Sequence, residues 1–168
     1  MIDAMPMTRQ ERMASIGLLI LRLGMGGFML THGVGKVKML RAGAFEMFGD
    51  PIGLGPHLSL ILVTFAEFVC ALLLIAGLAT RPAAAIVAFS MAVAAFVAHG
   101  ADPWTMERGY VLYTSGAAKT WFSKQPALMF LIPFLALVFT GAGGYSLDAW
   151  IRRRRLARIG GVPASTSA

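Results

Sequence analysis

Four long apolar stretches constrain this chain more than any other feature of its sequence. They cover roughly residues 16–31, 58–79, 82–97 and 127–140. A helix that crosses the hydrocarbon core of a bilayer needs about 17–25 mostly apolar residues, and these stretches lie near that length. Only 14% of the residues are charged, which is well below the usual share in a soluble domain. The sequence therefore predicts an all-α integral membrane protein, built as a bundle of four transmembrane helices.

Short amphipathic segments flank these stretches. Residues 36–48 place apolar side chains at helical spacing beneath three basic ones, which predicts a helix lying in the membrane interface. Ser146 stands where an N-cap is expected, just before a final basic amphipathic helix. We expect three parts: a cytoplasmic or interfacial segment over residues 1–15, a four-helix transmembrane domain over 16–144, and a basic amphipathic helix with a flexible tail over 145–168.

The basic residues favour a membrane partner over a nucleic acid. The formal net charge is +7, and five arginines gather at positions 152–155 and 158, just after the last apolar stretch. They are not interleaved with aromatic residues on a soluble face, so we expect no nucleic-acid binding. A basic cluster beside a membrane span is typical of binding to anionic lipid. Because lysine and arginine are enriched on the cytoplasmic side, the cluster also predicts that both termini lie in the cytoplasm.

Ionisable residues inside the apolar stretches are the first place to look for function, because a charge in lipid is costly and normally faces the bundle interior. Arg22 lies in the first stretch and Glu67 near the middle of the second. One interpretation is a structural ion pair between them, and the other is a carboxylate that carries protons or binds a ligand. Cys70 shares a helix face with Glu67, either as a packing residue or as a redox or ligand group. As the sole cysteine, it has no disulfide partner within the chain.

All three histidines fall on the outer side of the membrane in this topology. His32 ends the first span, His57 precedes the second and His99 ends the third. Together with Glu67, they suit a transition metal, a haem or a hydrogen-bonded quinone head group. The spacing does not choose among these ligands. The ordinary interpretation of His57, in its loop, is an interfacial or solvated histidine.

The residues that follow His32 also have two interpretations. In the ordinary one, Gly33 and Gly35 end the first helix and Lys36 extends its ammonium group to the interface. In the other, Lys36 joins His32 at a binding site. Both interpretations are open at the level of sequence.

As a set of motifs, the chain resembles the DoxX family. The resemblance covers residues 16–148 and rests on Arg22, His32-Gly33…Lys36, Glu67, Gly77-Leu78…Arg81-Pro82, His99 with Asp102-Pro103, and Gly141…Gly143…Tyr145-Ser146-Leu147-Asp148. It implies a bacterial or archaeal inner-membrane protein of four helices, in a family linked to terminal quinol oxidase, thiosulfate:quinone oxidoreductase and other membrane oxidoreductase assemblies. One departure is the segment Lys124-Gln125-Pro126, where relatives commonly carry a glutamate just before the fourth span.

Two hypotheses of function follow. In the first, the chain is a redox-associated subunit, and not a stand-alone enzyme, whose outer-side pocket binds a quinone or a metal centre and which acts with other membrane or periplasmic redox proteins. Its site residues are then Glu67 and Arg22 as catalytic candidates, His32, His99, Lys36 and Cys70 as cofactor-binding candidates, and His32 and His99 as metal ligands. In the second, the chain is a non-catalytic scaffold, small-solute carrier or cargo-binding module, because it carries no dinucleotide motif, cysteine pair or nucleophilic triad.

Overall fold

The computed structural model describes residues 7–119 and 121–160, and all regular elements within those residues are helical. The helices are α1 (Arg9–Arg41), α2 (Pro56–Thr64), α3 (Cys70–Ala76), α4 (Thr80–Val93), α5 (Met106–Thr114), α6 (Gln125–Thr140) and α7 (Leu147–Gly160). A short 3₁₀ turn, η1, covers Phe45–Met47. Two π-helical turns extend other helices: η2 (Phe65–Val69) joins α2 to α3, and η3 (Ala94–Ala98) ends α4.

Three helical segments in the described residues are long and apolar enough to cross a membrane. They are Arg9–Arg41, Pro56–Ala76 and Thr80–Ala98. The predicted fourth span corresponds to α6, an apolar helix of 16 residues. It is shorter than the about 17–25 residues that a membrane-spanning helix needs. The all-α membrane class is therefore confirmed with three candidate spans, while a fourth crossing by α6 stays a prediction.

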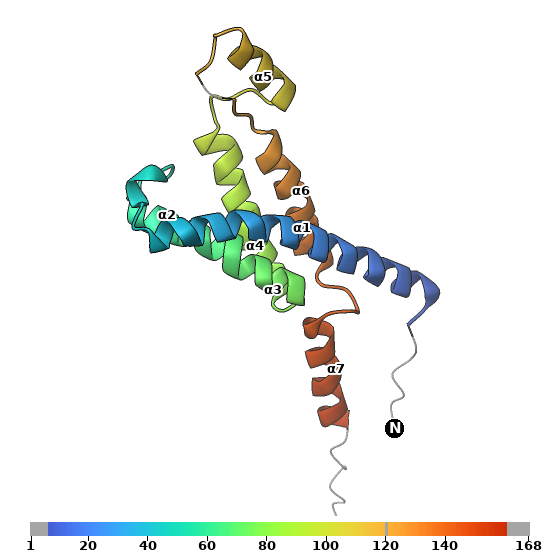
Figure 1. Cartoon of the computed structure of the whole chain (residues 1–168). Helices are drawn as coiled ribbons and strands as arrows, with labels where there is room; N and C mark the ends of the chain where they lie inside the picture. Colours follow the sequence, from blue (N-terminus) through green and yellow to red (C-terminus); the bar gives the residue numbers. More distant parts are fainter. Residues whose placement is uncertain (1–6, 120, 161–168) are drawn as a thin grey trace, which may run out of the picture.

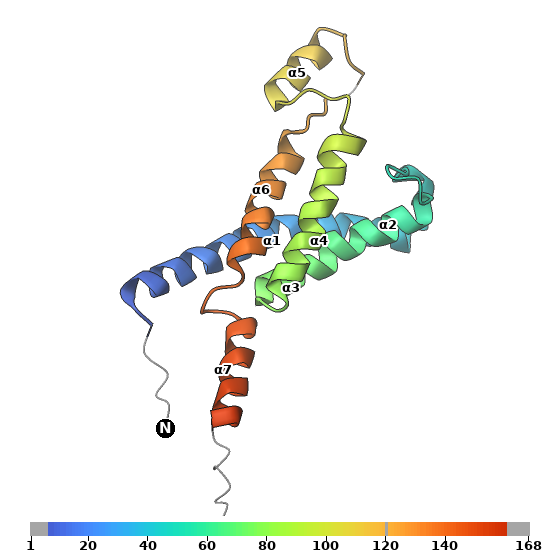
Figure 2. The same ribbon diagram turned by 180° about the vertical axis from the view of Figure 1, so that it is seen from behind.

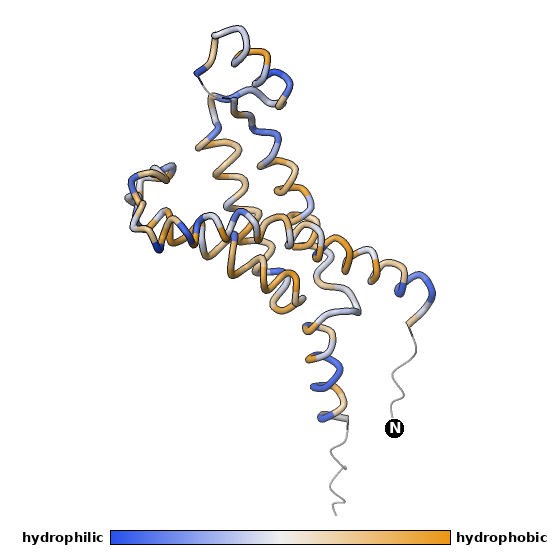
Figure 3. The backbone as a smooth tube through the Cα atoms, in the orientation of Figure 1, coloured by the Kyte–Doolittle hydropathy of each residue, from blue (hydrophilic) through white to orange (hydrophobic). Residues whose placement is uncertain are grey.

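The helices form two crossing pairs (Figures 1 and 2). α1 lies along α2, η2 and α3, and α4 packs along α6. The two pairs run in clearly different directions and meet where α3 and η2 contact α4. α5 lies beyond one end of α4 and α6, whereas α7 extends beyond the opposite end. Hydrophobic residues follow the crossing helices, and hydrophilic ones gather at the start of α1 and along α7 (Figure 3).

Small residues of α4 lie in the buried core. Ala84, Ala88 and Ala95 are buried, as their spacing along one helix face predicts. Phe134 and Leu137 of α6 are fully buried in the same cluster. The spacing of Ala84, Ala88, Ala92 and Ala95 in the third apolar stretch predicts an inward face, and three of the four are buried while Ala92 is half-buried. α4 packs along α6.

The first helix extends further at its C-terminal end than the sequence suggested. Gly33 and Gly35 do not end it, because α1 continues without interruption to Arg41. Its first residues lie before position 16, so the expected boundary between the N-terminal segment and the transmembrane domain falls inside a helix. The separate interfacial helix predicted over residues 36–48 is wrong, since its first part belongs to α1 and only the 3₁₀ turn η1 follows.

The end of the molecule that carries α7 is fastened by polar caps. The carboxylate of Asp148 accepts hydrogen bonds from the backbone amides of Ala79 (2.8 Å) and Thr80 (2.9 Å) at the start of α4. Ser146 caps α7 as predicted, because its Oγ accepts from the amide of Ala149 at 3.1 Å. Asp148 also donates its own amide to the carbonyl of Gly77. These bonds tie the base of α7 to the turn between α3 and α4.

Candidate functional site

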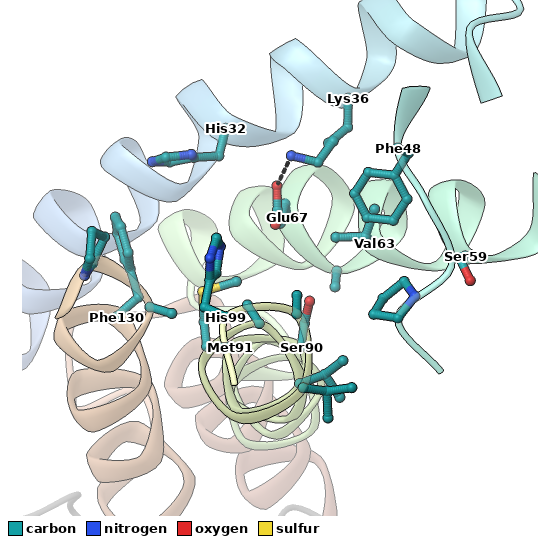
Figure 4. Close-up of a pocket in the computed structure, with 18 of the residues that line it drawn as sticks. His32, Lys36, Phe48, Ser59, Val63, Glu67, Ser90, Met91, His99 and Phe130 are labelled. Atoms are coloured by element: carbon teal, nitrogen blue, oxygen red, sulfur yellow. Dashed lines mark ion pairs between the residues drawn. The ribbon is translucent and has the colours of Figure 1, made fainter. Parts of the chain in front are cut away.

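A large pocket lies beside the second half of α4 and η3 (Figure 4). Its volume is about 1020 Å³, and its walls come from α1, α2 with η2, α4 with η3, α6 and the two loops nearby. The walls are mainly apolar, with Val63, Met91 and Phe130 among them. A large apolar pocket with a few polar groups is the usual form of a small-molecule site.

A carboxylate and an ammonium group meet inside this pocket. Glu67 of η2 is only 6% exposed, and its Oε2 lies 3.6 Å from Nζ of Lys36 on α1. That separation makes an ion pair but is too long for a hydrogen bond. Within the described residues, Glu67 Oε2 and Ser123 Oγ, which also lies in the pocket wall, are buried without a hydrogen-bond partner. Buried polar atoms are nearly always hydrogen-bonded. These two oxygens belong to residues of the pocket wall, whereas Arg22 Nε and Thr80 Oγ1 lack a hydrogen-bond partner elsewhere in the described residues.

His32 and His99 line the pocket from different helices. His99 Nδ1 lies 2.8 Å from Oδ2 of Asp102, and a carboxylate accepts hydrogen bonds, so Nδ1 carries the proton. The opposite ring nitrogen, Nε2, is not engaged by Asp102. The ring of His32 packs edge-on against Phe130, with centroids 5.5 Å apart. His32, His99, Lys36 and Glu67 all line this pocket (Figure 4).

Both π-helical turns occur at this site, and neither was predicted from the sequence. Glu67 lies inside η2, and His99 directly follows η3, where its amide donates to the carbonyl of Ala94 at 2.9 Å. Isolated π turns inside α-helices are frequent at functional sites, because the extra residue redirects side chains and loosens the backbone hydrogen-bond ladder. Here the turns set the directions of an acidic residue and an imidazole that face one cavity.

Gly33 brings α1 into direct backbone contact with η2. A Cβ at this position would lie 2.6 Å from the carbonyl carbon of Glu67 and 2.7 Å from Cα of Phe68. No side chain fits in that space. The glycine therefore acts as a contact residue and not as a helix terminator, and its position one turn before Lys36 sets the approach of that lysine to Glu67.

Arg22 lies away from this site, and the expected ion pair with Glu67 is wrong. Its guanidinium donates to the carbonyls of Leu74 (3.1 Å), Ile75 (3.4 Å) and Tyr145 (2.6 Å). The first two carbonyls belong to the C-terminal end of α3, which lacks further helical donors and carries the negative end of the helix dipole. These acceptors lie closer to Arg22 along the bundle than Glu67 does, so the arginine joins helix ends and does not line the pocket.

Two other candidate residues also lie outside the pocket. His57 is exposed and stacks on Phe45 with ring centroids 4.1 Å apart, so the expected convergence of three histidines reduces to two. Cys70 is completely buried in the hydrophobic core. Within the described residues, no three histidine, cysteine, aspartate or glutamate side chains lie close enough together to hold a metal ion.

A hydrogen-bonded loop forms one end of the pocket. Asp50 accepts from Oγ of Ser59 (2.8 Å) and from the amides of Gly55 (2.7 Å) and Leu54 (2.9 Å). The hydrogen bond from Ser59, followed by the one from Gly55, holds the pKa of Asp50 below its ordinary value. The bonds fix the loop against the start of α2, and Asp50 itself contributes to the pocket wall.

Comparison with known proteins agrees with this architecture. The family described as DoxX matches residues 17–100, which include Glu67 and His99. This chain belongs to the DoxX family. An uncharacterized protein of Haemophilus influenzae is 30% identical over an alignment of 145 residues, and the alignment covers 84% of this chain and 96% of that protein. No solved structure matches the chain.

Membership in the DoxX family and the long apolar helices together make this chain a membrane protein with several candidate spans. The family match contains most of α1 and all of the segments from α2 to η3. It therefore covers the three elements that carry His32, Lys36, Glu67 and His99. Asp102 and α6 lie beyond the family match.

Proposed function

We propose that this DoxX protein is a redox-associated subunit of a bacterial or archaeal inner membrane, with a pocket that binds the head group of a quinone. The observation that carries the proposal is the buried Glu67 carboxylate, which faces an apolar pocket with one oxygen lacking a hydrogen bond. A hydroxyl group of a reduced quinone is a suitable donor to that oxygen. A bound quinol would therefore supply the hydrogen bond that Oε2 of Glu67 lacks within the protein.

The charges in the pocket favour a neutral ligand. Lys36 lies beside Glu67, so the two formal charges offset each other. Asp50 also lies in the wall, but its carboxylate is engaged by hydrogen bonds from its own loop. His32, His99 and Ser123 add side chains that can form hydrogen bonds with a ligand. A quinone head is neutral and carries hydrogen-bonding oxygens on an aromatic-sized ring. It suits this set better than a charged headgroup does.

The side chains also suit proton exchange. A quinone bound here would carry two electrons and two protons between its oxidised and reduced forms. Glu67 exchanges a proton at its carboxylate, and His99 does so at Nε2 while Asp102 holds the opposite nitrogen. The electrons come from a partner, which we take to be another membrane or periplasmic redox protein. Arg22 has no part in this scheme, because its guanidinium is engaged at the end of α3.

Ligand binding in detergent tests the proposal. Quinones quench tryptophan fluorescence, and Trp121 contributes to the pocket wall. A benzoquinone should bind the purified protein, and Glu67→Gln and His99→Ala should each weaken binding by about tenfold, which is ~1.4 kcal/mol. Glu46→Gln, at an exposed position outside the pocket, is the matched control and should bind like the parent.

Two results would contradict the quinone assignment. One is unchanged affinity in a Glu67→Gln protein whose thermal unfolding resembles that of the parent. The other is no binding of any benzoquinone by the parent protein. The second result would favour the alternative function of a non-catalytic scaffold, small-solute carrier or cargo-binding module.

We also propose that the pocket faces the periplasm, with both termini in the cytoplasm and the arginine cluster of α7 on anionic lipid. The support is the charge of the exposed residues 152–155, with Arg154 packed over the ring of Trp150 at 3.9 Å. A membrane-impermeant maleimide should label Glu107→Cys in intact cells, and Arg154→Cys only after the membrane is opened. The reverse pattern would overturn this orientation.

A further inference from the structure

We propose that the pocket opens sideways into the bilayer through a groove between α2–η2 and α4–η3, and that this groove holds the apolar tail of the ligand. The inference rests on the proposed quinone site, because the groove continues from that site. It adds the ligand class, which is a quinone with a long alkyl or isoprenoid tail. It also adds the route of access, which is from the membrane and not from water.

The groove is apolar along its length. Leu62, Val63 and Phe65 line it from α2 and η2, and Ile86, Phe89 and Val97 line it from α4 and η3. The ion pair of the pocket, Lys36 with Glu67, lies toward α1 (Figure 4). The cavity thus has a polar end and an apolar arm, which matches a molecule with a polar head and an apolar tail.

The edges of the groove face lipid. Leu62 and Phe65 are each 45% exposed and Phe89 is 67% exposed, although all three belong to helical segments that are candidate membrane spans. Exposed apolar side chains on a membrane-spanning segment contact acyl chains. Because both edges of the groove carry exposed apolar side chains, the gap between them opens to the hydrocarbon region of the bilayer.

The floor of the groove is made of small residues. Ala66 of η2 and Ala94 and Ser90 of α4–η3 line the cavity, and Figure 4 places Val63 and Ser90 beside the same space. Small side chains at these positions leave room that a larger side chain would fill. A chain of linked methylene or isoprene groups fits such a narrow apolar space, and its burial there is favourable.

Tail-dependent binding tests the inference. The probes are two benzoquinones with the same head group, one without a tail and one with a ten-carbon alkyl tail. Ala94→Phe should weaken binding of the tailed quinone by about tenfold and change binding of the tail-free quinone by less than about twofold. Ala85→Phe is the matched control, because Ala85 is an exposed residue of the same helix that does not line the pocket, and it should change neither affinity.

A second variant covers the case in which Ala94→Phe does not fold. Ile86→Ala widens the groove, and it should weaken the tailed quinone several-fold relative to the tail-free one. Equal effects of these variants on both quinones, or none on either, would overturn the groove while leaving the head-group site in place. Failure of the parent to bind either quinone would overturn the proposed function itself, and the groove assignment with it.

Discussion

Nζ of Lys36 lies 3.6 Å from Oε2 of Glu67, across the contact between α1 and η2. The contact is close because Gly33, one turn earlier on α1, has no side chain to separate the two backbones. Breaking a buried ion pair by removing one partner is usually more costly than removing both, since a lone charge stays buried. The close contact at Gly33 therefore positions the Lys36–Glu67 ion pair, and the proposed ligand site depends on that pair.

We expect strong coupling between these two residues in a double-mutant cycle. Lys36→Met and Glu67→Gln should each lower the free energy of unfolding, and the double variant should lose less than the sum of the two by about 1 kcal/mol or more. Unfolding by a denaturing detergent in mixed micelles measures all four proteins. Additive losses would mean that the pair contributes no stability.

Arg22 should prove structural. Replacing it with glutamine removes charge-assisted hydrogen bonds to the carbonyls of Leu74 and Tyr145, and we expect a loss of about 3 kcal/mol in stability. Arg22→Lys should restore little of this, because an ammonium does not reproduce the guanidinium fork. Quinone affinity per folded molecule should stay the same. A loss of affinity without a loss of stability would instead return Arg22 to the binding site.

Two glycines of α1 should respond oppositely to alanine. Gly33→Ala forces a methyl group against the backbone of Glu67 and Phe68, and overpacking of this kind costs about 1–3 kcal/mol. Gly35→Ala meets no atom within 4 Å and should be neutral or stabilising by up to about 1 kcal/mol, because alanine favours helix. Thermal unfolding of the two variants in the same detergent makes the comparison. Equal behaviour would mean that the close contact at Gly33 is absent in the membrane protein.

The loop at Asp50 should give stability that depends on acid pH. Hydrogen bonds hold the pKa of Asp50 below its value in the unfolded chain, which is about 3.9. The folded state therefore favours the ionised form, so the stabilisation is complete above the unfolded pKa and is lost as pH falls through the folded pKa.

The melting temperature of the parent should accordingly exceed that of Asp50→Asn by a constant amount from pH 8 to 5, and the difference should shrink below about pH 4. Glu46→Gln, in the same loop, serves as the control for general acid effects. A difference that shrinks already between pH 7 and 5 would assign the pH dependence to another group.

The sequence alone determined the features that depend on local composition and spacing. Apolar stretches of sufficient length predicted membrane helices, because no polar segment of that length is stable in lipid. The alanine spacing of residues 84–95 predicted the buried face of α4, because that face depends on helical periodicity alone. Ser146 predicted the start of α7, because an N-cap depends on a single side chain beside its own backbone. The grouping of His32, Glu67 and His99 also followed from the order of the spans.

The tertiary structure decided which polar groups meet. A long side chain such as Arg22 can reach several acceptors. The acceptors that it binds depend on where the ends of α3 and α7 lie in the fold. The spacing of residues along the chain does not determine those positions. The same holds for Gly33, whose neighbours are backbone atoms of another helix. The π turns at Glu67 and before His99 have no local signal, because a helix gains the extra residue only where packing against its neighbours favours the altered direction.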